Sequence, residues 1–167
     1  GVFNVVQGDY RVGQYLTRHP RVAKISFTGE SGTGKKIMAD AAGSLKEVTL
    51  ELGGKSPLII FNDADIDNAI SGALLANFYT QGEVCTNGTR VFVQSGIYDK
   101  FIEKACQRSK KIKLGDPMDL DTQMGAFISS KHLDKVMDYI DKAKNSGARL
   151  VLGGNRHKSK ETENGFF

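Results

Sequence analysis

The sequence predicts an α/β fold with a largely parallel β-sheet. Segments with the pattern of strands alternate along the chain with segments that have the pattern of helices, an order typical of β–α–β units. The helical segments carry apolar residues at spacings of three and four, whereas the strand segments are short and apolar. Hydrophobic residues make up 40% and charged residues 25% of the chain, which is ordinary for a soluble globular protein.

The expected elements follow from these periodicities and from the glycine and proline residues between them. In the first part we expect a helix at 10–18, a strand at 22–27, a glycine-rich turn at 29–34 opening a helix that closes at Gly43, and strands at 46–52 and 57–61. In the second part we expect a helix capped by Asp63 or Asp65, a strand at 90–94, helices at 98–112 and 131–146, and a short strand at 149–152.

A break at Gly53-Gly54 is the best candidate for a domain boundary. It interrupts two strand-like segments, and two adjacent glycines weaken a strand. We therefore expect one domain to cover residues 1–52 and a second to cover 53–167. The beginning lacks an initiator Met, and the end leaves an apolar pair at 166–167. Both ends are therefore expected to be cuts through a longer protein.

Charge and cysteine content argue against several classes of protein. The net charge is +4, but the basic stretches at 108–113 and 156–160 contain no interleaved aromatic residues, so we interpret them as solvated surface and expect no nucleic-acid partner. No apolar run approaches the ~18 residues that cross a membrane, so we expect no membrane partner either. Two cysteines and three scattered histidines form no disulfide framework and no metal site, which favours a reducing cytoplasmic compartment.

The glycine-rich turn Gly29–Lys35 satisfies the phosphate-binding pattern G-x-x-x-x-G-K. Its eighth position is Lys36 instead of the Ser or Thr that binds Mg²⁺. A P-loop NTPase-like phosphate binder is therefore the alternative function. The dinucleotide pattern G-x-G-x-x-G is absent, yet a glycine-rich turn that opens a helix remains a suitable place for an anionic cofactor.

Cys85 is a candidate nucleophile because small and polar residues surround it. Gly82 precedes it and Thr86-Asn87-Gly88 follow. Such a loop lets a carbonyl reach the sulfur and directs backbone N–H groups at an oxyanion. The alternative is an inert buried thiol, the interpretation that we give to Cys106 on its amphipathic helix.

Glu51 is a candidate general base in the strand at 46–52. Alternation places Val48, Leu50 and Leu52 on one face of this strand, and Thr49 and Glu51 on the other. A carboxylate there is either a surface group on an edge strand or part of a site. Burial would make it a competent base near neutral pH.

Four motifs taken together resemble the aldehyde dehydrogenase superfamily over the whole chain. They are Gly1–Val6, Phe27-Thr28-Gly29, Glu51–Pro57 and Gln81–Cys85. The stretch Gly82–Arg90 looks most like the betaine aldehyde and aminoaldehyde dehydrogenase branch. The resemblance implies a three-layer α/β protein in which this chain spans the end of the Rossmann-like cofactor domain (1–52) and the start of the catalytic, thiol-bearing domain (53–167).

The resemblance also implies a reaction. An NAD(P)-dependent enzyme of this family oxidises an aldehyde to a carboxylic acid. Cys85 would attack the aldehyde to give a thiohemiacetal and then a thioester, and Glu51 would activate the water that releases the acid. The expected cofactor is NAD, with NADP as an alternative, and no metal is expected. By position, the cofactor contacts would be Gly8 on the adenine side, Gly29, Glu30, Ser31 and Gly32 at the phosphates and adenosine, and Leu52 beside the nicotinamide.

Family members often carry Ser at the position of Glu30, and a carboxylate there would repel phosphates. The family's oxyanion asparagine and ribose-binding glutamate would lie outside this chain. We therefore expect these 167 residues alone to be inactive. The full-length protein is expected to act on a small-molecule aldehyde as a homo-oligomer.

Overall fold

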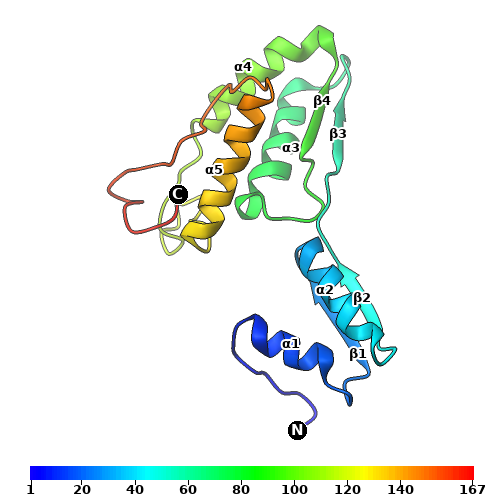
Figure 1. Cartoon of the computed structure of the whole chain (residues 1–167). Coiled ribbons are helices and arrows are strands. Elements are labelled where there is room, and N and C mark those ends of the chain that lie inside the picture. Colours follow the sequence, from blue (N-terminus) through cyan, green and yellow to red (C-terminus); the bar gives the residue numbers. More distant parts are fainter. The chain divides into compact units, whose positions relative to one another are not determined.

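The computed structural model describes residues 1–167 (Figure 1). The chain forms two compact units, Gly1–Gly54 and Lys55–Phe167. None of its helices combines the length and the apolar character needed to cross a membrane.

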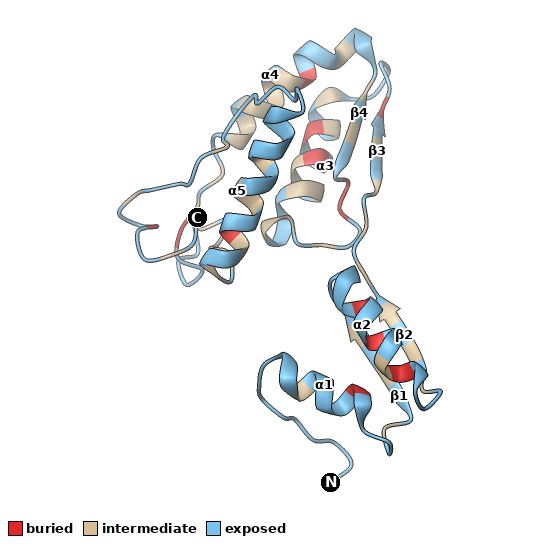
Figure 2. Cartoon of the chain, in the orientation of Figure 1, coloured by how far each residue is buried: buried red, intermediate tan, exposed pale blue.

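The first unit is a β–α–β arrangement preceded by a helix. Its elements are α1 (Tyr10–Arg18), β1 (Lys24–Thr28), α2 (Ser31–Ala42) and β2 (Glu47–Glu51). The two strands pair in parallel, with Lys24 opposite Glu47 and Thr28 opposite Glu51. The buried residues of α2 are Gly34, Ile37 and Ala41, shown in red in Figure 2. Their spacing of three and four turns one helix face inward.

Helix α1 is capped at its start and bonded to α2 near its end. The Asp9 side chain accepts a hydrogen bond from the Arg11 amide and caps the N-terminus. Polar contacts join α1 to α2: Thr17 Oγ1 donates to Asp40 at 2.9 Å, and Arg18 Nε donates to the other carboxylate oxygen at 2.9 Å. The Arg18 hydrogen bond, followed by that from Thr17, lowers the pKa of the Asp40 carboxyl.

The second unit contains another parallel strand pair and three long helices. Its elements are β3 (Pro57–Ile60), α3 (Ile66–Phe78), η1 (Tyr79–Gly82), β4 (Arg90–Val93), η2 (Ser95–Ile97), α4 (Tyr98–Ser109) and α5 (Ser130–Asn145). Strands β3 and β4 pair from Pro57–Arg90 to Ile60–Val93. The core lies between β3, α3 and α4, where Ile60, Ile70, Ala73 and Phe101 are buried together.

Capping side chains mark where α3 and α5 of the second unit begin. Of the two candidate caps of α3, Asp65 is the one that acts, because its side chain accepts from the Asn68 amide at 2.9 Å. Ser129 caps α5 by accepting from the His132 amide. Helix α5 ends just before Gly147, whose φ of 90° is a left-handed conformation that glycine adopts readily.

Several sequence expectations need correction. The predicted strand at 149–152 does not form, because no neighbouring strand pairs with it. The helix expected to reach residue 112 ends at Ser109, and 3₁₀-type hydrogen bonds from Lys111 and Ile112 tighten its last turn. The strands are parallel, as expected, but they form two separate two-stranded sheets.

Candidate active site

The glycine-rich turn and Glu51 meet at one edge of the first sheet. Strands β1 and β2 are parallel, so their carboxyl ends lie together, with Thr28 opposite Glu51. Just beyond this pair, the Gly29 amide donates a hydrogen bond to the Glu51 carbonyl at 3.0 Å. Ligands of open parallel sheets bind at this end of the strands.

The turn presents the N-terminus of α2. Gly29 allows the Phe27 ring to pack closely, because a Cβ there would lie 2.6 Å from that ring. Glu30 is extended and occupies the N-cap position, but its side chain makes no capping hydrogen bond. The first amides of a helix lack helical acceptors. Those of Ser31 and Gly32 therefore lie where an anionic group would be bound.

The P-loop interpretation has no support in the structure. Helix α2 begins at Ser31, so most of the Gly29–Lys35 motif is helical and does not form a loop around a phosphate. Gly34 has a packing role: a Cβ at this position would lie 2.9 Å from Leu52 Cδ2. The pattern match arises because close helix–strand packing and phosphate loops both require glycine.

Glu51 and Leu52 lie on the faces predicted from alternation. Along β2, Val48 and Leu50 are partly buried while Thr49 and Glu51 are exposed. Leu52 is half-buried and lies against α2 at Gly34. The exposed Glu51 carboxylate does not receive, from the residues of this chain, the burial that would favour its action as a base.

A cleft between α1, β1 and α2 adds residues that sequence reasoning missed. Its volume is about 410 Å³. Phe27 lies at the β1 end, and Thr33 and Lys36 line the α2 wall, facing Gly13 and Tyr10 of α1. Thr33 and Lys36 are three residues apart on α2, so the sequence indicated that they share one helix face.

Gly8, the predicted adenine-side contact, lies in the loop just before α1. Its lack of a side chain has a packing explanation, since a Cβ would lie 2.3 Å from Val12 Cγ2. Gly8 does not line the cleft between α1 and α2. Its role as a cofactor contact therefore rests on the family resemblance alone.

In the second unit, Cys85 lies exposed on a turn. The Asn87 amide donates to the Val84 carbonyl at 3.1 Å and closes this turn. From α3, Asn77 Nδ2 donates to the Gly88 carbonyl at 3.0 Å. A Cβ at Gly88 would lie 3.1 Å from Leu58 Cβ. The loop is therefore pressed against α3 and β3 while its thiol faces solvent.

Asn87 and Cys106 are both less exposed than Cys85. Asn87 is buried, and its Nδ2 has no hydrogen-bond partner. An orphaned donor two residues after an exposed thiol is unusual. Cys106 is half-buried on α4, outside the fully buried cluster, and both cysteines are free. No group of His, Cys, Asp or Glu side chains is arranged to hold a metal ion.

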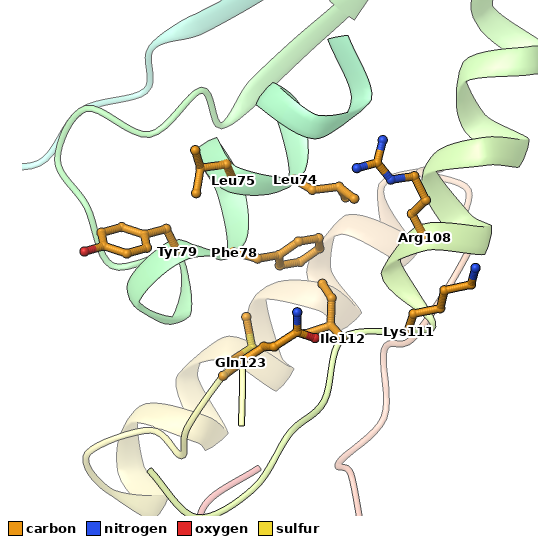
Figure 3. Close-up of a pocket in the computed structure, with 9 residues that line it drawn as sticks. Leu74, Leu75, Phe78, Tyr79, Arg108, Lys111, Ile112 and Gln123 are labelled. Atoms are coloured by element: carbon orange, nitrogen blue, oxygen red, sulfur yellow. The ribbon is translucent and has the colours of Figure 1, made fainter. Parts of the chain in front are cut away.

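A separate cavity of about 460 Å³ lies between the end of α3 and the end of α4 (Figure 3). Phe78 and Leu74 give it an apolar wall, while Arg108 and Lys111 bring positive charge to the opposite side. Arg108 is held there by hydrogen bonds to the Asp67 carbonyl and Ser71 Oγ. Cys85 does not line this cavity, so it is not the site of the proposed nucleophile.

The structure therefore brings the Gly29–Gly32 turn, Glu51 and Leu52 together in the first unit. It places Cys85 in the second unit. A glycine-rich turn at a helix N-terminus, a carboxylate beside it and an accessible thiol are groups that a cofactor-dependent thiol enzyme would need.

The chain belongs to the aldehyde dehydrogenase family, whose model matches residues 1–167. It is 63% identical over its full length to a betaine aldehyde dehydrogenase of Vibrio vulnificus strain YJ016, covering 34% of that protein. It is 56% identical to the human 4-trimethylaminobutyraldehyde dehydrogenase over 92% of the chain and 31% of that protein.

The fold matches a solved structure with a TM-score of 0.90. That structure is a Staphylococcus aureus betaine aldehyde dehydrogenase in complex with NAD⁺. It is 44% identical to the chain, and the match covers 93% of this chain and 31% of that one. The chain thus spans about a third of the length of the relatives it matches. These likenesses confirm the family resemblance and the expected α/β fold class.

Proposed function

We propose that this chain carries the nucleophile and the general base of an NAD-dependent aldehyde dehydrogenase that converts an aldehyde into a carboxylic acid. The observation that carries the proposal is the Cys85 loop, which exposes its thiol while hydrogen bonds from Asn77 and Asn87 hold its backbone. An accessible thiol on a held loop is suited to covalent catalysis.

The chemistry assigns a step to each group. The Cys85 thiol releases its proton to water, and Sγ adds to the aldehyde carbon to form a thiohemiacetal, whose oxyanion is stabilised by backbone N–H groups of the turn. When bound, NAD⁺ accepts the hydride that leaves this carbon. The thioester that remains on Cys85 is hydrolysed by a water molecule from which the Glu51 carboxylate takes a proton. The acid is released and the thiol is restored.

The first unit fits the cofactor in two places. The open N-terminus of α2 at Ser31 and Gly32 suits the pyrophosphate. The cleft between α1 and α2 offers Phe27, Thr33 and Gly13 to the adenosine. The Glu30 carboxylate adds negative charge beside this site, which disfavours the further phosphate of NADP. We therefore propose NAD over NADP, as the NAD⁺ complex of the S. aureus relative also supports.

The proposed substrate class is an aldehyde that carries a quaternary ammonium group. Support comes from the relatives, named for betaine aldehyde and for 4-trimethylaminobutyraldehyde. The choice between these two aldehydes is left to measurement, because their reacting groups are the same and only the spacer differs.

We further propose that the full-length protein is a cytoplasmic homo-oligomer. Two free cysteines suit a reducing compartment. Ile59 and Phe92 are adjacent in the parallel pair and are 59% and 53% exposed. Paired apolar side chains on one sheet face are normally covered by other protein. They therefore indicate that other protein covers this sheet face in the full-length protein, either the rest of the polypeptide or a partner subunit.

The test uses the full-length polypeptide that contains this chain. NADH formation is followed with betaine aldehyde, 4-trimethylaminobutyraldehyde and an uncharged aldehyde of similar length, each with NAD and with NADP. We expect turnover with the two charged aldehydes and a lower KM for NAD. Absence of turnover with every aldehyde and both cofactors would reject the function. The 167 residues alone are expected to give no turnover.

A further inference from the structure

The segment that leads into the Cys85 loop has a strained backbone. Thr80, Gln81 and Gly82 have φ angles of 51°, 54° and 77°. Left-handed backbone is readily adopted by glycine but is unfavourable for the two other residues. Such conformations persist only when neighbouring groups hold them, and they gather at functional sites.

Two side chains of this segment reach the loop before α5 and the first turn of α5. Gln81 Nε2 donates to the Ala126 carbonyl at 3.4 Å. Glu83 Oε1 lies 2.9 Å from Nε2 of His132. Glu83 also closes the strained turn through its backbone, because its amide donates to the Thr80 carbonyl at 2.9 Å. Glu83 is therefore held on both its main chain and its side chain.

His132 is itself well placed to act as an anchor. Its amide donates to the Ser129 cap at 3.2 Å, which ties it to the first turn of α5. Its ring packs edge-on against Phe127, with centroids 5.2 Å apart and planes at 68°. A carboxylate only accepts hydrogen bonds, so the imidazole nitrogen facing Glu83 is the one that carries a hydrogen.

The geometry points to His132 as a positioning residue for Cys85, acting through the Glu83 carboxylate. Glu83 directly precedes the Val84–Asn87 turn that presents the thiol. The His132–Glu83 contact holds this turn from the α5 side, whereas Asn77 holds it from the α3 side. This inference rests on the proposed function for its catalytic consequence. The anchoring contact itself is independent of that function.

The test separates the polar contact from the packing of His132 on Phe127. In the full-length polypeptide, His132→Ala removes both, while His132→Gln removes the ring but keeps an N–H donor that faces Glu83. Glu83→Ala removes the acceptor. Asp138→Asn is the matched control, because it breaks the ion pair with Lys142 on the same helix α5.

The first readout is hydrogen exchange of the peptide covering 79–88, which needs no activity. Because the contact is partly exposed, we expect roughly twofold to fivefold faster exchange in His132→Ala and in Glu83→Ala. The double variant should be no faster than either single one. His132→Gln and Asp138→Asn should behave like the wild type.

The second readout is steady-state turnover. We expect kcat to fall about threefold to tenfold in the two alanine variants while KM for NAD stays within about twofold, since the loop and not the cofactor turn is disturbed. Equal impairment by His132→Gln and His132→Ala, or multiplicative effects in the double variant, would overturn the inference. A wild type without turnover would reject the proposed function. The hydrogen-exchange result would still show whether the His132–Glu83 contact holds the turn.

Discussion

The Gly29 amide donates a hydrogen bond to the Glu51 carbonyl at 3.0 Å, which joins the glycine-rich turn, the proposed cofactor contact, to the strand that ends in the proposed base. A parallel pair creates this contact, since Thr28 and Glu51 stand opposite each other where both strands end. Any displacement of β2 relative to β1 therefore changes the position of the proposed base relative to the glycine-rich turn.

Replacement of Glu51 by Gln should slow hydrolysis of the thioester while leaving the preceding hydride transfer intact. We expect the first burst of NADH to remain and kcat to fall about 10²-fold, as for loss of a general base. Rapid-mixing measurement of NADH checks this. Glu47→Gln is the control, because Glu47 lies on the same face at the other end of β2, paired with Lys24. Its kcat should be unchanged. Equal loss of burst and steady state in Glu51→Gln would argue against deacylation as its step.

Glu30→Gln should improve cofactor binding. The carboxylate lies at the N-cap of α2 without a capping hydrogen bond, where it competes with a bound phosphate for the positive helix terminus. Removing one such charge is worth about 0.3–1 kcal/mol, or roughly twofold to fivefold in Kd. Titration with NAD and NADP at low and high salt measures this. We expect a larger gain for NADP, and a weaker NAD affinity in the variant would contradict the account.

Gly34→Ala should destabilise the protein although it improves helix propensity. The new Cβ would lie 2.9 Å from Leu52 Cδ2, with Leu50 Cδ1 at 3.6 Å behind. Overpacking costs about 1–3 kcal/mol, which matches or outweighs the ~1 kcal/mol gained from propensity. Gly72→Ala in α3 meets nothing within 4 Å and should stabilise by about 0.5–1 kcal/mol. Urea unfolding of both variants checks the contrast. A stabilised Gly34→Ala would show that Leu52 yields freely.

Packing of α1 on α2 should weaken at acidic pH, because Asp40 becomes protonated. The Arg18 and Thr17 hydrogen bonds lower the pKa of this carboxyl from 3.8. A lowered folded pKa gives stability that is present above the unfolded pKa and is lost as pH falls through the folded value. Hydrogen exchange of residues 10–18, corrected for intrinsic rates, should therefore accelerate below pH 3.8. Asp40→Asn should remove this dependence, and an unchanged dependence in the variant would assign it to other carboxyls.

Capping and periodicity explain why much of the fold could be predicted. The predicted and observed bounds of helix α1 agree: the sequence places its end before Pro20, and in the structure Asp9 caps its start. The start of α2 was placed too late, since glycines at 32 and 34 look like loop residues until their packing against Leu52 is known. The strand at 149–152 was predicted from local pattern alone, but a strand needs a partner.

Some residues of the candidate site could likewise be predicted from the sequence, and others could not. Cys85 stands out in the sequence because small and polar residues surround it, and Glu51 stands out because apolar residues flank its carboxylate. The cleft at Thr33 and Lys36 depends on how α1 packs on α2, which local sequence does not reveal. The His132–Glu83 contact joins residues far apart in the chain, so only the folded structure shows it.

The most direct test of the central claim is to trap the covalent intermediate on Cys85. The full-length Glu51→Gln variant is mixed with betaine aldehyde and NAD, quenched in acid and digested for peptide mass spectrometry. We predict an acyl adduct on the peptide that contains Cys85 and none on the peptide that contains Cys106. A burst of NADH without an adduct on Cys85, or an adduct on Cys106 instead, would contradict the account.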